Sequence, residues 1–272
     1  GIKRASGFLT PSIISSDIMG FGIKQPYFLV LNQYSDLTIS LFKTNQTTLY
    51  ETEYRANFLD EKVKISSIIE PQIFSKKING YINVIGEKKY PEDYKLEYNF
   101  TIFDKKKSLT NYDHEITDFI SNKVSIKKYQ KNKVSSFNTF YLQNLRTSEV
   151  EDPIIFPYYN EKTINKIFNN NIIISNELGI LNLFHKKKIH TRIDHKTEIG
   201  FNKFYKNGII LENLASISNL LYNTREKNNV EKGHFEIRPL LSSTISFPLI
   251  KNNKIKSKEI LTPKIQVNFS PS

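Results

Sequence analysis

The sequence predicts an all-β protein, an antiparallel meander of the long strands found in transmembrane β-barrels. Apolar and polar residues alternate with a period of two in many segments. These segments run for about nine to twelve residues, whereas strands of soluble sandwiches have about five or six and tilted bilayer strands about nine to eleven. Aromatic residues reach 12% while hydrophobic residues make up only 39%. This balance is expected where one sheet face meets an apolar phase and the other meets water.

The strands are expected in the following order along the chain. The first two lie in "SGFLTPSIISS" and "GFGIKQPYFLV", each with a proline in its middle. Further alternating segments are Leu37–Leu41, Tyr50–Phe58, Tyr94–Ile102, Val134–Leu145, Ile189–Phe201, Gly208–Tyr222, Phe235–Phe247 and Ile260–Phe269. About 12–14 strand candidates can be counted in all. Residues 1–272 are therefore expected to form one partial, unclosed barrel meander without an internal domain boundary.

One strand makes the prediction of two faces explicit. Tyr50, Thr52, Tyr54, Ala56 and Phe58 should share a lipid-facing side, and the side facing the lumen should carry Glu51, Glu53, Arg55 and Asn57.

Two stretches depart from the alternation. Between Lys105 and Lys123 we expect a long loop with one or two helical turns, because Ile116, Phe119 and Ile120 fall at helix-like spacing. The stretch Thr147–Asn171 is expected to be irregular.

The charge balance is basic, with 39 Lys+Arg against 27 Asp+Glu and a formal net charge of +12. Only six of the cations are arginine. Because specific base readout relies on the bidentate arginine fork, this composition gives little support to nucleic-acid recognition. A soluble β-protein that binds polyanions through its lysines remains an alternative.

Catalytic constellations are not recognisable in the sequence. There is no cysteine, hence no thiolate nucleophile or cysteine metal site. The histidines closest in sequence are His185, His190 and His195. Their odd spacing places successive histidines on opposite faces of a strand. Asp194 and Glu198 share a face, but Lys196 between them favours a salt-bridge ladder over an acid–base pair. The prediction is a protein that is not an enzyme, with no metal and no cofactor.

The opening stretch "RASGFLTPSIISSDIMGFGIKQPYFLVLNQYSDLTISLFKTNQTTLYETEYR" contains an ordered series of motifs. These are Arg4, the run Ser6–Pro11, the glycines of Gly20–Gly22, the triplet Pro26–Phe28, the run Gln33–Asp36 and the strand end Glu53–Arg55. In this order they resemble the start of the barrel in the LPS-assembly protein family LptD, also called the organic solvent tolerance protein family. The resemblance fills about the first 58 residues and is diffuse beyond them, although "EDPIIFPYY" and "ILTPKIQVNFSPS" look similar to later strands of the family. Phe28, Gln33 and Ala56 depart from the family pattern without changing charge or strand period.

The resemblance implies a closed barrel of about twenty-six strands in the outer membrane of a Gram-negative bacterium. This chain would supply the N-terminal half of that barrel, without its signal peptide, periplasmic domain and last strands. The implied partners are lipopolysaccharide, a lipoprotein plug similar to LptE, and a periplasmic lipopolysaccharide bridge protein that binds through the missing N-terminal domain. The matching motif positions are Ser6, Gly7, Phe8, Tyr27, Asp36, Tyr54 and Arg55.

The resemblance implies a lateral gate near the first strands, and Pro11 and Pro26 fall where its prolines are expected. The alternative is that these prolines lie at strand ends or bulges and have no gating role. In a closed barrel the first and last strands pair along a seam, and an unpaired backbone group in lipid costs several kcal/mol. Prolines in the first two strands remove hydrogen-bond donors and weaken the ladder there. A general diffusion porin, the main alternative, has no need for such a weakness.

Overall fold

The computed structural model describes residues 4–16, 19–72, 77–103, 119–145, 152–167, 171–226, 229–252 and 258–271. Over these ranges the chain consists of β-strands and their connections and contains no helix. No helix able to cross a membrane is therefore found in the described part of the chain. The predicted all-β fold class is confirmed.

The contacts divide the chain into two compact units. Unit 1 comprises residues 1–128 and 138–155, and unit 2 comprises residues 129–137 and 156–272.

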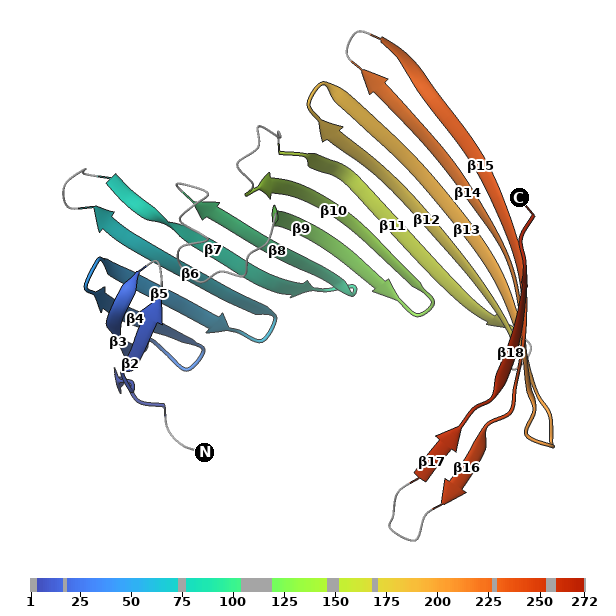
Figure 1. The fold of residues 1–272 in the computed structure, drawn as a ribbon, viewed down its shortest axis with the longest axis horizontal. Coiled ribbons are helices and arrows are strands. Elements are labelled where there is room, and N and C mark those ends of the chain that lie inside the picture. The colour runs from blue at the N-terminus through green and yellow to red at the C-terminus, as the bar shows by residue number, and fades with distance from the viewer. Residues whose placement is uncertain are drawn as a thin grey trace. The chain divides into compact units, whose positions relative to one another are not determined.

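Unit 1 is a meander of antiparallel strands, each paired with the next along the chain (Figure 1). A short first strand is split into two pieces that both pair with β3. The strands that lie wholly or mostly in this unit are β1 Gly7–Phe8, β2 Ser12–Ser16, β3 Gly20–Val30, β4 Ser35–Thr44, β5 Thr48–Asn57, β6 Glu61–Gln72, β7 Lys77–Tyr90, β8 Tyr94–Phe103, β9 Phe119–Gln130 and β10 Lys133–Asn144.

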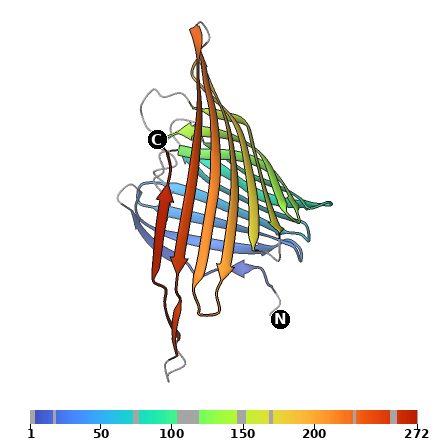
Figure 2. The ribbon, with the colours of Figure 1, turned by 90° about the vertical axis from the view of Figure 1, so that its right-hand side faces the viewer.

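Unit 2 continues the same hairpin pattern with longer strands. Figure 2 shows β13, β14 and β15 as neighbouring ribbons that run side by side, in agreement with their continuous pairing. The strands are β11 Ile154–Ile167, β12 Ile172–His185, β13 Lys188–Phe204, β14 Ile210–Glu226, β15 Asn229–Ser246, β16 Leu249–Asn252, β17 Lys258–Leu261 and β18 Lys264–Phe269. β16 and β17 form a separate hairpin that projects beyond the ends of β15 and β18 (Figure 1).

The strand order confirms a partial, unclosed meander. One 16-stranded sheet runs from β1 through β3 to β15 and ends at β18, with β2 beside β3. In the described ranges, no pairing joins β18 to β1 or β2. The sheet has more strands than the 12–14 expected from the sequence.

Three expectations about individual segments were wrong. Phe119 and Ile120 begin strand β9 and do not form a helical turn, while residues 104–118 lie outside the described ranges. Most of the stretch expected to be irregular forms β11, whose alternation is hidden by adjacent apolar residues and by Pro157. The last segment is two strands, because Pro263 separates β17 from β18 and cannot donate to a ladder.

The two faces of the sheet in unit 1 differ in chemistry. Cross-strand partners lie on one face, so Tyr54 shares a face with its partners Leu37 and Ile65. Glu53 lies on the opposite face. We define the apolar face of unit 1 by Ile23, Tyr27, Ile39, Leu41, Tyr50, Tyr54, Ile65, Val84 and Phe100, and its charged face by Lys24, Asp36, Glu51, Glu53, Arg55, Lys64, Glu87, Lys95, Glu97 and Lys127. The predicted separation of β5 into an apolar and a charged face is confirmed from Tyr50 to Asn57, and Phe58 lies just beyond the strand.

Burial is inverted relative to a soluble core. Among the described residues, twelve polar or charged residues but only five apolar ones are buried. The main apolar cluster, around Phe42 and Leu49, belongs to the charged face, because these two residues lie opposite each other and next to Lys24. On the apolar face, Ile39 is 43% exposed and Tyr50 46% exposed. Among the described residues of unit 1, large apolar side chains thus lie exposed on the apolar face.

Candidate functional site

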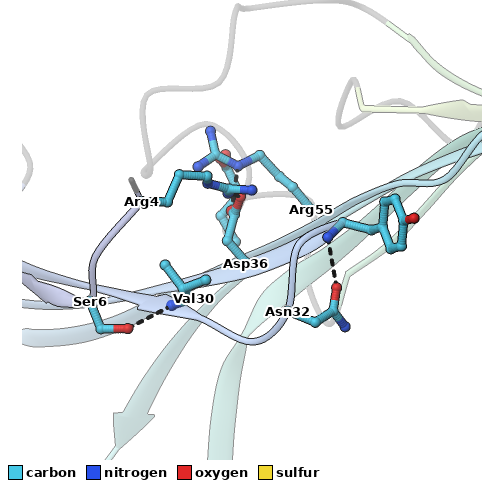
Figure 3. Close-up of polar contacts among 8 residues, drawn as sticks. Arg4, Ser6, Val30, Asn32, Asp36 and Arg55 are labelled. Carbon is cyan, nitrogen blue, oxygen red and sulfur yellow. Dashed lines mark hydrogen bonds and ion pairs between the residues drawn. The ribbon is translucent and has the colours of Figure 1, made fainter. Parts of the chain in front are cut away.

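The motif residues near the N-terminus converge on one carboxylate. Asp36, at the start of β4, pairs with Arg4 through Oδ2 and with Arg55 through Oδ1, at 2.8 Å from Arg55 Nε (Figure 3). The Asp36 side chain is only 8% exposed, and the Arg4 guanidinium also lies 5.7 Å from the centre of the Phe28 ring. We call Arg4, Asp36 and Arg55 the arginine clamp. It ties the segment before β1 to the ends of β4 and β5.

A tight turn between β3 and β4 positions the clamp carboxylate. The backbone N–H groups of Leu31 and Asn32 both donate to the carbonyl oxygen of Ser35. Asn32 Oδ1 accepts from the Tyr34 N–H at 2.8 Å, as Figure 3 shows. This side-chain bond is the Asx pattern that favours asparagine in turns. The turn brings Asp36 back alongside the N-terminal segment.

The hydroxyl of Ser6 continues the attachment of the first strand. Ser6 Oγ accepts a hydrogen bond from the Val30 N–H at 2.8 Å (Figure 3). Gly7 and Phe8 then pair with Phe28 and Tyr27, and the rings of Phe8 and Tyr27 meet edge to face at 5.0 Å. The first strand is thereby fixed at its N-terminal end.

The pairing is interrupted immediately after β1. Phe8 lies opposite Tyr27 and Ser12 lies opposite Lys24, so three residues of the first strand, 9–11, face two residues of β3, 25–26. This extra residue is a β-bulge, a place where proline is tolerated. We call these five residues the proline gap. Pro11 therefore lies between β1 and β2, outside the regular ladder expected from the sequence.

The Pro26 nitrogen, which has no hydrogen to donate, faces the first strand. The Pro26 carbonyl accepts from the Leu9 N–H at 3.0 Å. Since the nitrogen and carbonyl of one strand residue point the same way, the Pro26 nitrogen also faces Leu9, but it has no hydrogen to donate. The donor is thus absent between the first strand and β3, and not along the other edge of the first strand, where a closing strand would pair.

Ion pairs connect the strands across the charged face. Glu53 contacts Arg55 and lies 2.7 Å from Lys64 Nζ. Further along, Lys95 bridges Glu87 at 2.7 Å and Glu97 at 3.0 Å. The same ladder includes the pairs Lys24–Glu51, Lys62–Glu87 and Lys127–Glu97. Most lysines of this face are therefore neutralised by a carboxylate on a neighbouring strand.

The charged face is hollowed next to the proline gap. A cavity of about 550 Å³ is lined by residues that include Leu9, Lys24, Pro26, Ser40, Glu51 and Tyr81. Its wall combines residues of the gap with four members of the ion-pair ladder, Lys24, Glu51, Glu53 and Lys64. A polar ligand on this face would thus lie directly beside the weakest point in the pairing of the first strand.

The structure brings some motif positions together and separates others. Arg4, Ser6, Asp36 and Arg55 meet at one end of the first strand, whereas Tyr54 lies on the apolar face beside Leu37 and Ile65. In the glycine motif, Gly20 has a φ of 79°, which favours glycine.

The residues considered for catalysis do not form a site. Lys196 pairs with Glu198 at 2.6 Å and Arg192 with Asp194 at 3.0 Å, as expected for a salt-bridge ladder. His190 stacks on Tyr222, and His195 lies on the other face of β13, opposite Asn219. The described ranges contain no group of three or more His, Cys, Asp or Glu that could hold a metal ion.

No protein-family model matches the chain, and no curated protein matches it.

Sequence reasoning missed one polar side chain of this region. Gln25 lies on the apolar face, opposite Leu41 and between Ile23 and Tyr27. Its Nε2 donates to the Leu9 carbonyl at 2.9 Å and to the Pro26 carbonyl at 3.1 Å. The sequence does contain a sign of this role, because Gln25 is a polar residue at an apolar position of the alternation and stands directly before Pro26.

Proposed function

We propose that this chain is the N-terminal part of an LptD-like outer-membrane barrel that delivers lipopolysaccharide to the outer leaflet through a lateral gate near its first strands. One observation carries the proposal. Arg4, Asp36 and Arg55 come from three separate motifs and meet in one clamp, while Pro11 and Pro26 meet in one gap. Motifs that lie far apart in the sequence thus meet where the first strand is attached to its neighbours.

The chemistry of the apolar face supports a membrane location. A bilayer accepts exposed Ile, Leu, Tyr and Phe side chains that would aggregate in water. Near the turn between β7 and β8, Lys88 lies over the Tyr90 ring at 5.7 Å and Lys128 over the Tyr94 ring at 4.4 Å. Tyrosine with snorkelling lysine is the composition of a membrane–water interface. These tyrosine–lysine pairs and the apolar face together favour an outer-membrane barrel over a soluble polyanion-binding protein.

The proline gap gives the proposed gate a physical basis. Lipopolysaccharide has a polar sugar part suited to the charged face and acyl chains suited to the bilayer, so it must leave the lumen sideways. A first strand that lacks a backbone bond to β3 and carries a bulge can bend away without breaking a long ladder. The lipoprotein plug and the periplasmic bridge protein enter the proposal through the family resemblance alone. A general porin would need neither the gap nor the clamp beside it.

The double substitution Pro11→Ala with Pro26→Ala in the full-length protein tests the proposed function. Pro26→Ala supplies a backbone donor that faces the Leu9 carbonyl, and Pro11→Ala adds an N–H in the bulge between β1 and β2. Pairing near the gate should therefore tighten by about 1 to 3 kcal/mol. We expect normal insertion but poor lipopolysaccharide export, measured as increased sensitivity of cells to large hydrophobic antibiotics. Pro153→Ala and Pro263→Ala, which lie outside the first strands, serve as controls. Normal lipopolysaccharide display in a correctly inserted double variant would contradict the gating role.

A further inference from the structure

The side chain of Gln25 occupies the place of the hydrogen-bond donor that Pro26 lacks. Leu9 and Pro26 form a close pair in which the Leu9 N–H donates to the Pro26 carbonyl at 3.0 Å. The reverse bond, from residue 26 to the Leu9 carbonyl, cannot form with proline. Gln25 Nε2 lies 2.9 Å from that carbonyl oxygen and donates to it.

The position of Gln25 is costly unless its amide is needed there. The residue lies on the apolar face opposite Leu41, where its neighbours along the strand are Ile23 and Tyr27. A primary amide moved into an apolar environment without partners costs several kcal/mol. Its second hydrogen bond, to the Pro26 carbonyl at 3.1 Å, keeps it against the backbone.

We infer that Gln25 is a positioning residue for the gate, a side-chain latch that holds the first strand against β3 across the proline gap. A backbone bond opens only when the strand itself moves, whereas a side-chain bond is released by rotation about the Gln25 side-chain torsions. The gap is thus closed by one backbone bond, from the Leu9 N–H to the Pro26 carbonyl, and by one side-chain bond that can break while β1 and β2 keep their pairing on either side. The function of this latch in export rests on the proposed function, but the latch itself is a property of the fold.

A double-mutant cycle on the full-length protein in detergent micelles tests the latch. Gln25→Met keeps the length of the side chain but removes the donor, and Pro26→Ala supplies a backbone donor to the Leu9 carbonyl. Hydrogen exchange of the backbone amides of residues 8–12, apart from Pro11, is the readout, because it reports local opening. We expect Gln25→Met alone to accelerate this exchange about fivefold, the effect of one hydrogen bond. In the Pro26→Ala background the same change should have no effect, since the backbone bond replaces the latch.

Two controls separate the latch from general loosening. Ser15→Leu, on the same face in β2 but beyond the gap, should leave exchange of residues 8–12 unchanged. Exchange of β4 and β5 should be equal in all variants. Equal acceleration by Gln25→Met in both backgrounds, or none in either, would overturn the inference. If Gln25→Met alone prevents folding, the Gln25→Met/Pro26→Ala variant must restore it, and failure to do so would also overturn the inference. The expected exchange pattern with normal lipopolysaccharide display in the Pro11→Ala/Pro26→Ala variant would support the latch and reject the proposed function.

Discussion

At the scale of single residues, side chains supplement the short backbone pairing at the N-terminal end of the first strand. Ser6 accepts the Val30 N–H, Gln25 donates to the Leu9 carbonyl, and Arg4 pairs with Asp36. β1 itself contributes only two paired residues. β2, by contrast, pairs with β3 over five residues. The attachment of the N-terminal end of the strand therefore depends on a few specific contacts, and each can be substituted without change to the strands around it.

The arginine clamp gives the most direct test at this scale. Asp36→Asn removes the charge shared by Arg4 and Arg55 and leaves two guanidinium groups facing each other. Because these arginines are about half exposed, with side-chain exposures of 44% and 49%, we expect a loss of about 1 to 3 kcal/mol in unfolding free energy, less than for a fully buried pair. Denaturant unfolding of the full-length protein in detergent measures it.

The matched control for the clamp is Glu226→Gln. Glu226 and Lys188 lie 3.8 Å apart, and their side chains are 47% and 48% exposed. Such a surface pair contributes about 0 to 1 kcal/mol. Equal losses for Asp36→Asn and Glu226→Gln would show that the clamp is an ordinary surface ion pair.

At the scale of strands, a glycine on the apolar face shows how two neighbours fit. Gly86 in β7 lies opposite Tyr98 in β8, and a Cβ at Gly86 would lie 2.3 Å from the tyrosine ring. The ring covers the glycine backbone, an arrangement known as aromatic rescue. We expect Gly86→Ala to displace the ring and to lower the unfolding free energy by about 1 to 3 kcal/mol. Gly200→Ala, whose Cβ would have no neighbour closer than 3.8 Å, should change it by no more than about 0.5 kcal/mol. A loss for Gly200→Ala as large as for Gly86→Ala would contradict this account.

The strands that sequence reasoning identified are those with strict alternation. β5 alternates from Tyr50 to Asn57 and β8 from Tyr94 to Ile102, and both were predicted within a few residues. β12 contains the runs Ile172–Ile174 and Ile180–Leu181, and adjacent apolar residues erase the period-two signal. The bulge at Pro11 was not predictable, because it is defined by the register of two strands and not by either sequence alone. For the same reason the partner of Gln25 required the structure.

At the scale of the whole molecule, the decisive question is which medium the apolar face meets. Within unit 1, residues of the charged face form ion pairs and line a cavity, while Ile39, Leu41 and Tyr50 of the apolar face are exposed. A water-soluble sheet with this distribution would present a large adhesive surface. In a bilayer the apolar face would be stabilised by contact with lipid, and the polar groups of the charged face would have to point away from the lipid.

Two neighbouring residues of β4 test this distribution. Ile39 lies on the apolar face and Thr38 on the charged face, where it is opposite Glu53. Lysine on the lipid side of a strand costs about 2 to 4 kcal/mol near the midplane of the bilayer, so Ile39→Lys should reduce folding of the full-length protein into phospholipid vesicles. Thr38→Lys should fold normally, because its ammonium can pair with Glu53. The folded fraction is measured by protease protection at equal protein and lipid concentrations. If the protein were soluble, Ile39→Lys would fold as well as Thr38→Lys without lipid, and the membrane assignment would fail.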